Sequence, residues 1–369
     1  METHRDKCGE TFEKCTELCK GANPAALSRR KFMKICLAGA GAAALGLGLP
    51  SASNVIARGG EATKGQPGNG YIPGYIALAN SGELERREQA LFALLAPCRL
   101  CPRLCAARRT DGLMGICGTA DTFKVASYGP HFGNERALVG AYGSGNIFFS
   151  NCNLLCVFCQ NWQINHRGDG RLTTHAALAD IMISLQRMGC HNINLVTPTH
   201  LIPHLVRALR LAIADGLNIP LLYNTSAYDS LEVIQLLDGV VDIYLPDFKF
   251  QASEIAAHFL NGARGYMRHA AAAIKEMHRQ VGALDIVDGI ANRGLLVRHL
   301  VLPENLAGTD VFVRWVVSEL GADTHVNIMG QFRPEFRARY YPPLDRRITQ
   351  QEFDQAMRWA REAGLQNFH

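Results

Sequence analysis

The sequence carries little net charge and has no apolar run long enough to cross a bilayer. Its 369 residues include 38 Lys or Arg and 33 Asp or Glu, which gives a formal net charge of +5. A mild basic excess spread along the chain predicts no nucleic-acid partner. The apolar run of residues 35–49 is shorter than the roughly 20 residues of a membrane-spanning helix, so we expect no stable membrane span. The hydrophobic content of 48% excludes global disorder.

The first residues have the pattern of a targeting segment. Arg29 and Arg30 precede the apolar run closely, and the combination resembles a twin-arginine export signal. Residues 1–57 are therefore interpreted either as such a signal, with export to the periplasm, or as the tail of a cytoplasmic protein. Cys8, Cys15 and Cys19 lie ahead of the arginines, and we assign them no role. Residues 58–80, which begin with a stretch rich in Gly and Pro, are expected to be a linker.

Short apolar runs alternate with segments of helical periodicity from about residue 143. We expect strands at 147–149, 192–196, 220–223, 240–245, 294–302 and 324–329, with helices at 174–188, 200–217, 231–237, 253–281, 309–320 and 349–363. This alternation predicts an α/β fold with parallel strands, either the partial (β/α)6 barrel that we favour or an open doubly wound sheet. Residues 141–369 would form this core, and residues 81–140 a cysteine-rich N-terminal lobe. Both architectures place ligands at the carboxyl ends of the strands.

One group of cysteines follows the first expected strand. Cys152, Cys156 and Cys159 have the spacing Cys-x3-Cys-x2-Cys, with no fourth cysteine nearby. A structural zinc site takes four ligands, and a [4Fe-4S] cluster normally takes four thiolates. Three thiolates would leave one iron open to the amino and carboxylate groups of S-adenosylmethionine. The alternative is a zinc site with a distant fourth ligand. Phe158 could pack beside a cluster and offer a ring face to adenine.

The cysteine motif and several longer blocks resemble the radical S-adenosylmethionine (radical SAM) superfamily, whose signature is Cys-x3-Cys-x-aromatic-Cys. The match is closer to the branch similar to pyruvate formate-lyase activating enzyme. It runs from about Cys98 to the C-terminus and includes residues 129–133, 143–161, 192–200, 242–249, 293–303 and 327–334. The resemblance implies a [4Fe-4S] cluster and S-adenosylmethionine as cofactors. It also implies a protein substrate that gains a glycyl radical, and an electron donor of the flavodoxin or ferredoxin type.

A second group of cysteines precedes the core. Cys98, Cys101, Cys105 and Cys117 have the spacing Cys-x2-Cys-x3-Cys-x11-Cys. Four thiolates suffice for a closed zinc site or for a fully ligated iron–sulfur cluster. Three interpretations stay open: a structural metal clip that orders the lobe, an auxiliary cluster that passes electrons to the first site, and cysteines without metal, reduced or in disulfides.

The ends of the second and third expected strands carry short polar side chains. Thr197 and Thr199 stand where related enzymes have an acidic segment that contacts the amino group of S-adenosylmethionine. Their hydroxyls could accept those ammonium hydrogens, or Thr199 could cap the next helix. Asn224 and Ser226 could reach ribose hydroxyls, as a similar segment does in activating enzymes, or they could simply form a turn.

The later strands end in charged and amide side chains. Asp247 and Lys249 could pair with each other or line the pocket. Arg298 suits the task of holding a cofactor carboxylate, because its guanidinium offers a bidentate fork. Asn327 and Gln331 could contact adenine or substrate.

Two functions compete at this point. The first is an enzyme that cleaves S-adenosylmethionine reductively and abstracts hydrogen from a substrate. The second is a non-catalytic iron–sulfur module that carries electrons or senses redox state. The missing fourth cysteine favours the enzyme, since an electron carrier gains nothing from an iron without a protein ligand.

Overall fold

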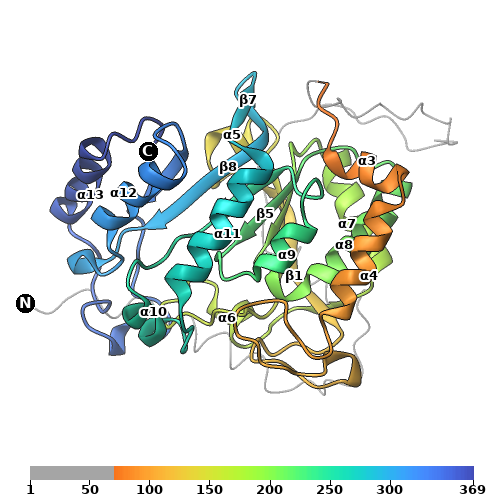
Figure 1. Cartoon of the computed structure of the whole chain (residues 1–369), viewed down its shortest axis with the longest axis horizontal. Coiled ribbons are helices and arrows are strands. Elements are labelled where there is room, and N and C mark those ends of the chain that lie inside the picture. The colour runs from red at the N-terminus through yellow and green to blue at the C-terminus, as the bar shows by residue number, and fades with distance from the viewer. Residues whose placement is uncertain (1–69) are drawn as a thin grey trace, which may run out of the picture. The chain divides into compact units, whose positions relative to one another are not determined.

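The computed structural model describes residues 70–369. The expected export signal, Cys8, Cys15, Cys19 and the glycine-rich start of the linker therefore lie outside the described residues. Within the described range, nine strands form a sheet in the order β3-β1-β2-β4-β5-β6-β8-β7, with β9 paired to β8 (Figure 1). The strands are β1 (Phe123–His131), β2 (Ser144–Phe149), β3 (Arg171–Thr173), β4 (Ile193–Val196), β5 (Leu221–Thr225), β6 (Ile243–Pro246), β7 (Asp285–Val287), β8 (Ile290–Leu300) and β9 (His325–Met329).

Six of these strands are parallel neighbours, in the series β2, β4, β5, β6, β8 and β9. They are the six strands that the sequence predicts. The sheet is not closed, because β1 and β3 add antiparallel strands beside β2 while β9 ends the parallel series. The α/β class and the partial (β/α) architecture are thus confirmed. Strands β1, β3 and β7 were not predicted, because they lie outside the strand–helix alternation on which the prediction rests.

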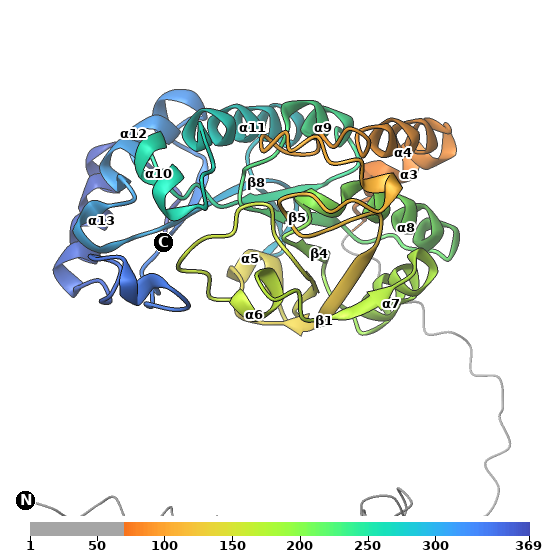
Figure 2. The ribbon, with the colours of Figure 1, turned by 90° about the horizontal axis from the view of Figure 1, so that it is seen from below.

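Helices cover the outer side of the parallel strands. Figure 2 shows them as an arc that runs from α13 through α11 and α9 to α7, with the short α5 and α6 on the other side. The helices are α3 (Gly74–Asn80), α4 (Glu83–Ala93), α5 (Arg136–Val139), α6 (Trp162–Asn165), α7 (His175–Arg187), α8 (Ile202–Ala214), α9 (Leu231–Leu236), α10 (Ser253–Phe259), α11 (Tyr266–Val281), α12 (Thr309–Glu319) and α13 (Gln350–Glu362). Short 3-10 turns lie at Arg109–Asp111, Thr199–Leu201, Pro303–Asn305 and Ala338–Tyr340.

Local sequence explains where two of the predicted helices begin. The Thr174 hydroxyl accepts a hydrogen bond from the Ala177 amide and caps α7. Thr349 and Glu352 form a reciprocal capping box at α13. The apolar residues of α7, α8 and α11 are buried in the same core as the strands. This packing holds the strands, and the loops that follow them, in place.

The linker prediction is wrong at its C-terminal end. Residues 74–80 form helix α3, and Tyr75 is fully buried with its hydroxyl donating to the Ile219 carbonyl at 2.7 Å. The buried carboxylate of Asp242 accepts hydrogen bonds from the Tyr71 hydroxyl and the Gly74 and Leu221 amides. These contacts tie the segment to the sheet.

The boundary expected near residue 140 does not separate two folded units. Residues 81–140 and 141–369 belong to one compact unit. Strand β1, from the expected lobe, pairs along its length with β2, the first strand of the expected core. The cysteine-rich part is therefore an extension of the core, confined to the loops between α4 and β1.

Candidate functional site

A cavity of about 470 Å³ lies at the carboxyl ends of the parallel strands. Each of the six strands contributes residues to the lining of this cavity, from the strand itself or from the residues that follow it. This is expected for a parallel α/β sheet. The lining includes Phe148 on β2, Thr197 after β4, Asn224 and Ser226 at β5, Asp247 and Lys249 after β6, Arg298 on β8, and Asn327 with Gln331 at β9.

The three cysteines of the first group line this cavity from the loop between β2 and α6. The thiols of Cys152 and Cys156 are buried, and that of Cys159 is partly exposed. Two N–H groups point at sulfur: the Leu154 amide donates to Cys152 Sγ and the Asn165 side chain to Cys159 Sγ, both at 3.3 Å. Phe158 packs edge-on against Phe250 and Phe332 and faces the same cavity.

The electrostatics of the three thiols depend on burial and on one lysine. Burial raises the pKa of all three cysteines, and the Lys249 ammonium acts in the opposite direction on each. Lys249 Nζ donates to Asp247 Oδ2 at 2.8 Å, so the two residues both pair and line the cavity. Burial acts to lower the pKa of Lys249, but the Asp247 carboxylate and Cys156 raise it above its ordinary value, and the side chain stays cationic.

Some buried polar atoms of the cavity wall have no partner among the described residues. They include Ser226 Oγ and Asp247 Oδ1. Unpaired buried polar atoms are costly, so such atoms mark places where a ligand or water completes the hydrogen bonding. The donor set also suits a soft metal centre, because three thiols converge on one cavity beside a cation that offsets thiolate charge. The residues present therefore fit an iron–sulfur cluster with a polar small molecule beside it.

The guanidinium of Arg298, predicted to hold a cofactor carboxylate, is engaged by a carboxylate of the protein itself. Its Nε and one terminal nitrogen each donate to Glu135 at 2.7 Å, and Asn327 donates to the same carboxylate at 2.7 Å. Burial alone would raise the pKa of Glu135, but the Arg298 contact holds it below its ordinary value. His299, the next residue, faces the opposite way and bonds the Phe248 carbonyl and the Thr309 hydroxyl. Sequence reasoning missed Glu135.

The other predicted cofactor residues line the cavity, with one exception. Thr197 adopts a left-handed backbone, φ 60°, at the end of β4. Thr199 is buried away from the cavity, where its hydroxyl lies 3.1 Å from that of Thr225. Thr225 in turn donates to the buried Asp229. Thr199 does not cap α8 either, so the capping role proposed for it is wrong. The lining residues from the prediction are Phe158, Thr197, Asn224, Ser226, Arg298, Asn327 and Gln331.

Comparisons with known proteins agree with this geometry. Residues 146–287 match the model of the radical SAM superfamily. An uncharacterized protein of Methanocaldococcus jannaschii, MJ0674, is 32% identical over 277 residues, which cover 73% of this chain and 75% of the relative. This chain belongs to the radical SAM superfamily. Radical SAM proteins use a [4Fe-4S] cluster and S-adenosylmethionine, which are the two cofactors that the sequence predicts.

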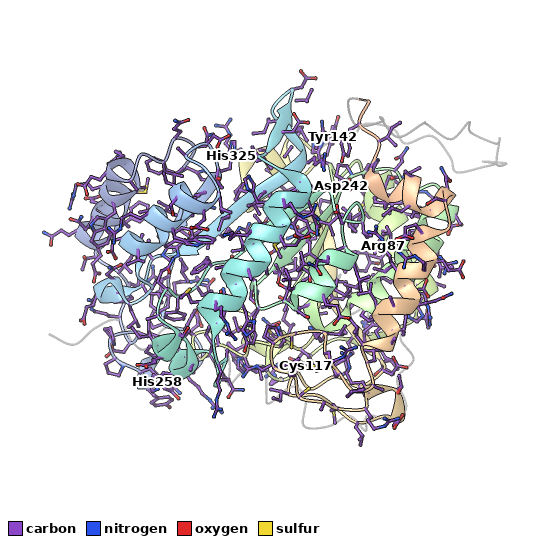
Figure 3. The ribbon with its side chains drawn as sticks, in the orientation of Figure 1. Arg87, Cys117, Tyr142, Asp242, His258 and His325 are labelled. Carbon is purple, nitrogen blue, oxygen red and sulfur yellow. The ribbon has the colours of Figure 1, made fainter. Side chains whose placement is uncertain are left out.

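The second cysteine group lies outside the radical SAM match, in the loops between α4 and β1. Figure 3 labels Cys117 there, at the lower edge of the view. Cys105 and Cys117 flank Gly115 so closely that a Cβ on this glycine would lie 3.2 and 3.5 Å from their sulfurs. Burial raises the pKa of Cys101 to about 12. Burial also acts on Cys105, but the amides of Ala107 and Ile116 lower its pKa below the ordinary value.

Arg103 joins this group to the radical SAM cysteine loop. Its guanidinium donates to the carbonyls of Asn153, Leu154, Leu260 and Asn261 at 2.7–3.0 Å. These contacts span the loop that carries Cys152 and the turn after α10.

Two asparagines beside Cys152 complete the junction. The side chain of Asn151 donates to the Gly118 carbonyl and the Thr119 hydroxyl, next to Cys117. The side chain of Asn153 donates to the Tyr228 carbonyl and lowers the pKa of Cys101 against the effect of burial. Sequence analysis did not predict this contact between the loops that carry the two cysteine groups.

Two findings concern the described residues as a whole. Within residues 70–369, no group of three or more His, Cys, Asp or Glu side chains is arranged to hold a metal ion, and the described cysteines are free thiols. The fit of the first cysteine group to a cluster therefore rests on the soft thiol donors and on the single cavity that all three of them line. None of the helices in this range has the length and apolar character needed to cross a membrane.

Proposed function

We propose that this radical SAM protein cleaves S-adenosylmethionine reductively at a cluster held by Cys152, Cys156 and Cys159, and that it abstracts hydrogen from a glycine of a protein substrate. When bound, the cluster and S-adenosylmethionine supply an electron and a sulfonium whose C–S bond breaks to give a 5′-deoxyadenosyl radical. The observation that carries the proposal is the convergence of three thiols, one lysine and unpartnered polar atoms on a single cavity.

In this proposal, different residues of the cavity bind different parts of the two cofactors. The three cysteines would serve as thiolates, and Lys249 would offset their negative charge. Ser226 Oγ and Asp247 Oδ1 would complete hydrogen bonds with the polar groups of S-adenosylmethionine. Phe158 would lie against adenine, with Asn224 near the ribose. Thr197 and Gln331 would complete the cavity lining around S-adenosylmethionine.

Arg298 keeps a role in this proposal, although its fork is engaged by Glu135. Its second terminal nitrogen has no hydrogen-bond partner within residues 70–369 and lies on a side chain that lines the cavity. Glu135 and Asn327 would hold the guanidinium so that this nitrogen meets the cofactor carboxylate. Glu135 is thus a positioning residue.

The resemblance to the branch of pyruvate formate-lyase activating enzyme supports the choice of substrate. A non-catalytic electron-transfer module is less well supported, because it has no use for a polar cavity beside its thiols. We also propose that Cys98, Cys101, Cys105 and Cys117 bind a metal that braces the loop of Cys152. Metal analysis of the purified protein would distinguish zinc from an iron–sulfur cluster.

The test uses the full chain, reconstituted anaerobically with iron and sulfide and reduced with dithionite. We expect 5′-deoxyadenosine and methionine to form from S-adenosylmethionine, and Cys156→Ala to lose both the products and part of the bound iron. Cys190→Ala is the matched control, because Cys190 is also buried but belongs to neither group. Product formation by Cys156→Ala at the wild-type rate would overturn the proposal.

The substrate is tested separately. A candidate protein labelled with α-deuterated glycine should transfer deuterium into 5′-deoxyadenosine. Cleavage without transfer from such proteins would remove the glycyl-radical claim and leave the reductive cleavage standing.

A further inference from the structure

A surface of arginines and aromatic rings lies beside the radical SAM cysteine loop. Within residues 331–347 there are five arginines and two acidic residues. Arg346 pairs with Glu352 and Glu304. Arg333, Arg337 and Arg339 are exposed and form no ion pair within residues 70–369. These three arginines therefore present positive charge that no described carboxylate neutralises.

Aromatic rings stack between the cations of this surface. The Trp162 and Phe336 rings are stacked at 5.6 Å, with Arg167 over Trp162 and Arg337 over Phe336. Beside them, Arg339 lies over Tyr340, which is 66% exposed. We call Trp162, Arg167, Phe336 and Tyr340, together with Arg333, Arg337 and Arg339, the cationic–aromatic surface. Tyr, Trp and Arg are the residue types that dominate binding energy at protein interfaces.

The cationic–aromatic surface touches the cysteine loop directly. The Arg337 amide donates to the Val157 carbonyl at 2.9 Å. The Phe336 ring lies 4.3 Å from the His166 ring, and His166 Nε2 donates to the Cys156 carbonyl at 3.1 Å. The surface thus contacts Val157 directly and reaches Cys156 through a single imidazole, that of His166.

We propose that the cationic–aromatic surface is the docking site of an acidic one-electron carrier protein that reduces the site held by Cys152, Cys156 and Cys159. This proposal rests on the proposed function. Opposite charge selects an acidic partner and speeds its encounter with the surface. The reduced flavin or iron–sulfur centre of the carrier loses one electron, and the site behind the cysteine loop gains it. No bond or proton is exchanged.

The test compares two reductants of the full reconstituted chain. The variant R333E/R337E/R339E reverses the charge of the surface without touching a residue that lines the cavity. We expect its rate of 5′-deoxyadenosine formation with reduced flavodoxin to fall about tenfold at low salt, while the rate with dithionite stays within twofold of wild type. The control variant R314E/R358E/R361E makes the same change of charge on α12 and α13, and we expect both of its rates to stay unchanged.

Salt and direct binding provide further readouts. The flavodoxin-driven rate of the wild type should fall as ionic strength rises, and that of the variant should be nearly independent of salt. Calorimetric titration with flavodoxin should show binding to the wild type and the control variant, with at least tenfold weaker binding to R333E/R337E/R339E. The milder R333Q/R337Q/R339Q variant serves if charge reversal disturbs folding.

The outcomes separate the two proposals. Equal flavodoxin binding by wild type and the surface variants would overturn the docking site. Normal flavodoxin-driven cleavage, with loss of hydrogen transfer from a protein substrate, would also overturn it and assign the surface to the substrate. If neither reductant yields 5′-deoxyadenosine in the wild type, the proposed function fails, and the titration still decides the docking site.

Discussion

The two cysteine groups use the same side chain in opposite settings. Cys152, Cys156 and Cys159 open onto a cavity, next to the charged Lys249. The second group lines no part of that cavity and instead contacts the backbone and side chains of its own loops and of the cysteine loop. A cofactor that meets a small molecule needs the first arrangement, and a site that holds loops together needs the second. The comparison therefore agrees with the two proposals, in which the first group carries the chemistry and the second supports the loops.

The largest expected effect concerns the supporting group. A metal present at a thousand times its dissociation constant stabilises the folded state by about 4 kcal/mol. We expect Cys101→Ala to lower the free energy of unfolding by about this amount relative to Cys190→Ala, an equally buried control. Denaturant unfolding with and without a chelator measures this loss of stability. The chelator should lower the free energy of unfolding of the wild type and leave that of Cys101→Ala unchanged. Equal stability and equal metal content in the two variants would mean that the lobe is held by its hydrogen bonds alone.

A smaller effect is expected on the cavity side, at Glu135. Its carboxylate and the Arg298 guanidinium are both largely buried, at 2% and 14% side-chain exposure. Glu135→Gln leaves a buried cation without its partner, which costs about 3 kcal/mol. We expect this loss in denaturant unfolding, together with weaker binding of S-adenosylmethionine and normal iron content. Glu85→Gln, which breaks an exposed pair with Arg210, is the control. A Glu135→Gln protein with wild-type stability would show that Arg298 needs no fixed partner.

Much of the fold and part of the candidate site could be predicted from local sequence, and the remaining site contacts could not. The six parallel strands and the loop of Cys152, Cys156 and Cys159 were predictable, because strand–helix alternation and cysteine spacing are properties of neighbouring residues. Glu135 was not predictable, because its partner Arg298 is 163 positions away. The position of Thr199 outside the cavity lining was not predictable either, because the turn after β4 carries its hydroxyl into the core, toward Thr225. Such choices depend on tertiary packing, which no short motif encodes.

The smallest effect tests the junction between the two groups. Arg103 donates to four backbone carbonyls, and a hydrogen bond that involves a charged group contributes about 1.5–3 kcal/mol. Because Gln keeps part of this bonding, we expect Arg103→Gln to lower the free energy of unfolding by about 2 kcal/mol and to speed amide hydrogen exchange in residues 151–155. Arg99→Gln is the control on the same lobe, since Arg99 forms only an exposed pair with Glu232.

The Arg103 result also shows how far the two groups depend on each other. If the lobe braces the cysteine loop, Arg103→Gln keeps its metal in the lobe but loses iron at the three-cysteine site more quickly when exposed to a chelator. Unchanged exchange in residues 151–155 with the expected loss of stability would contradict the brace, because the stabilisation would then come from the turn at Leu260 and Asn261 alone. In that case the two groups share a surface without sharing a function.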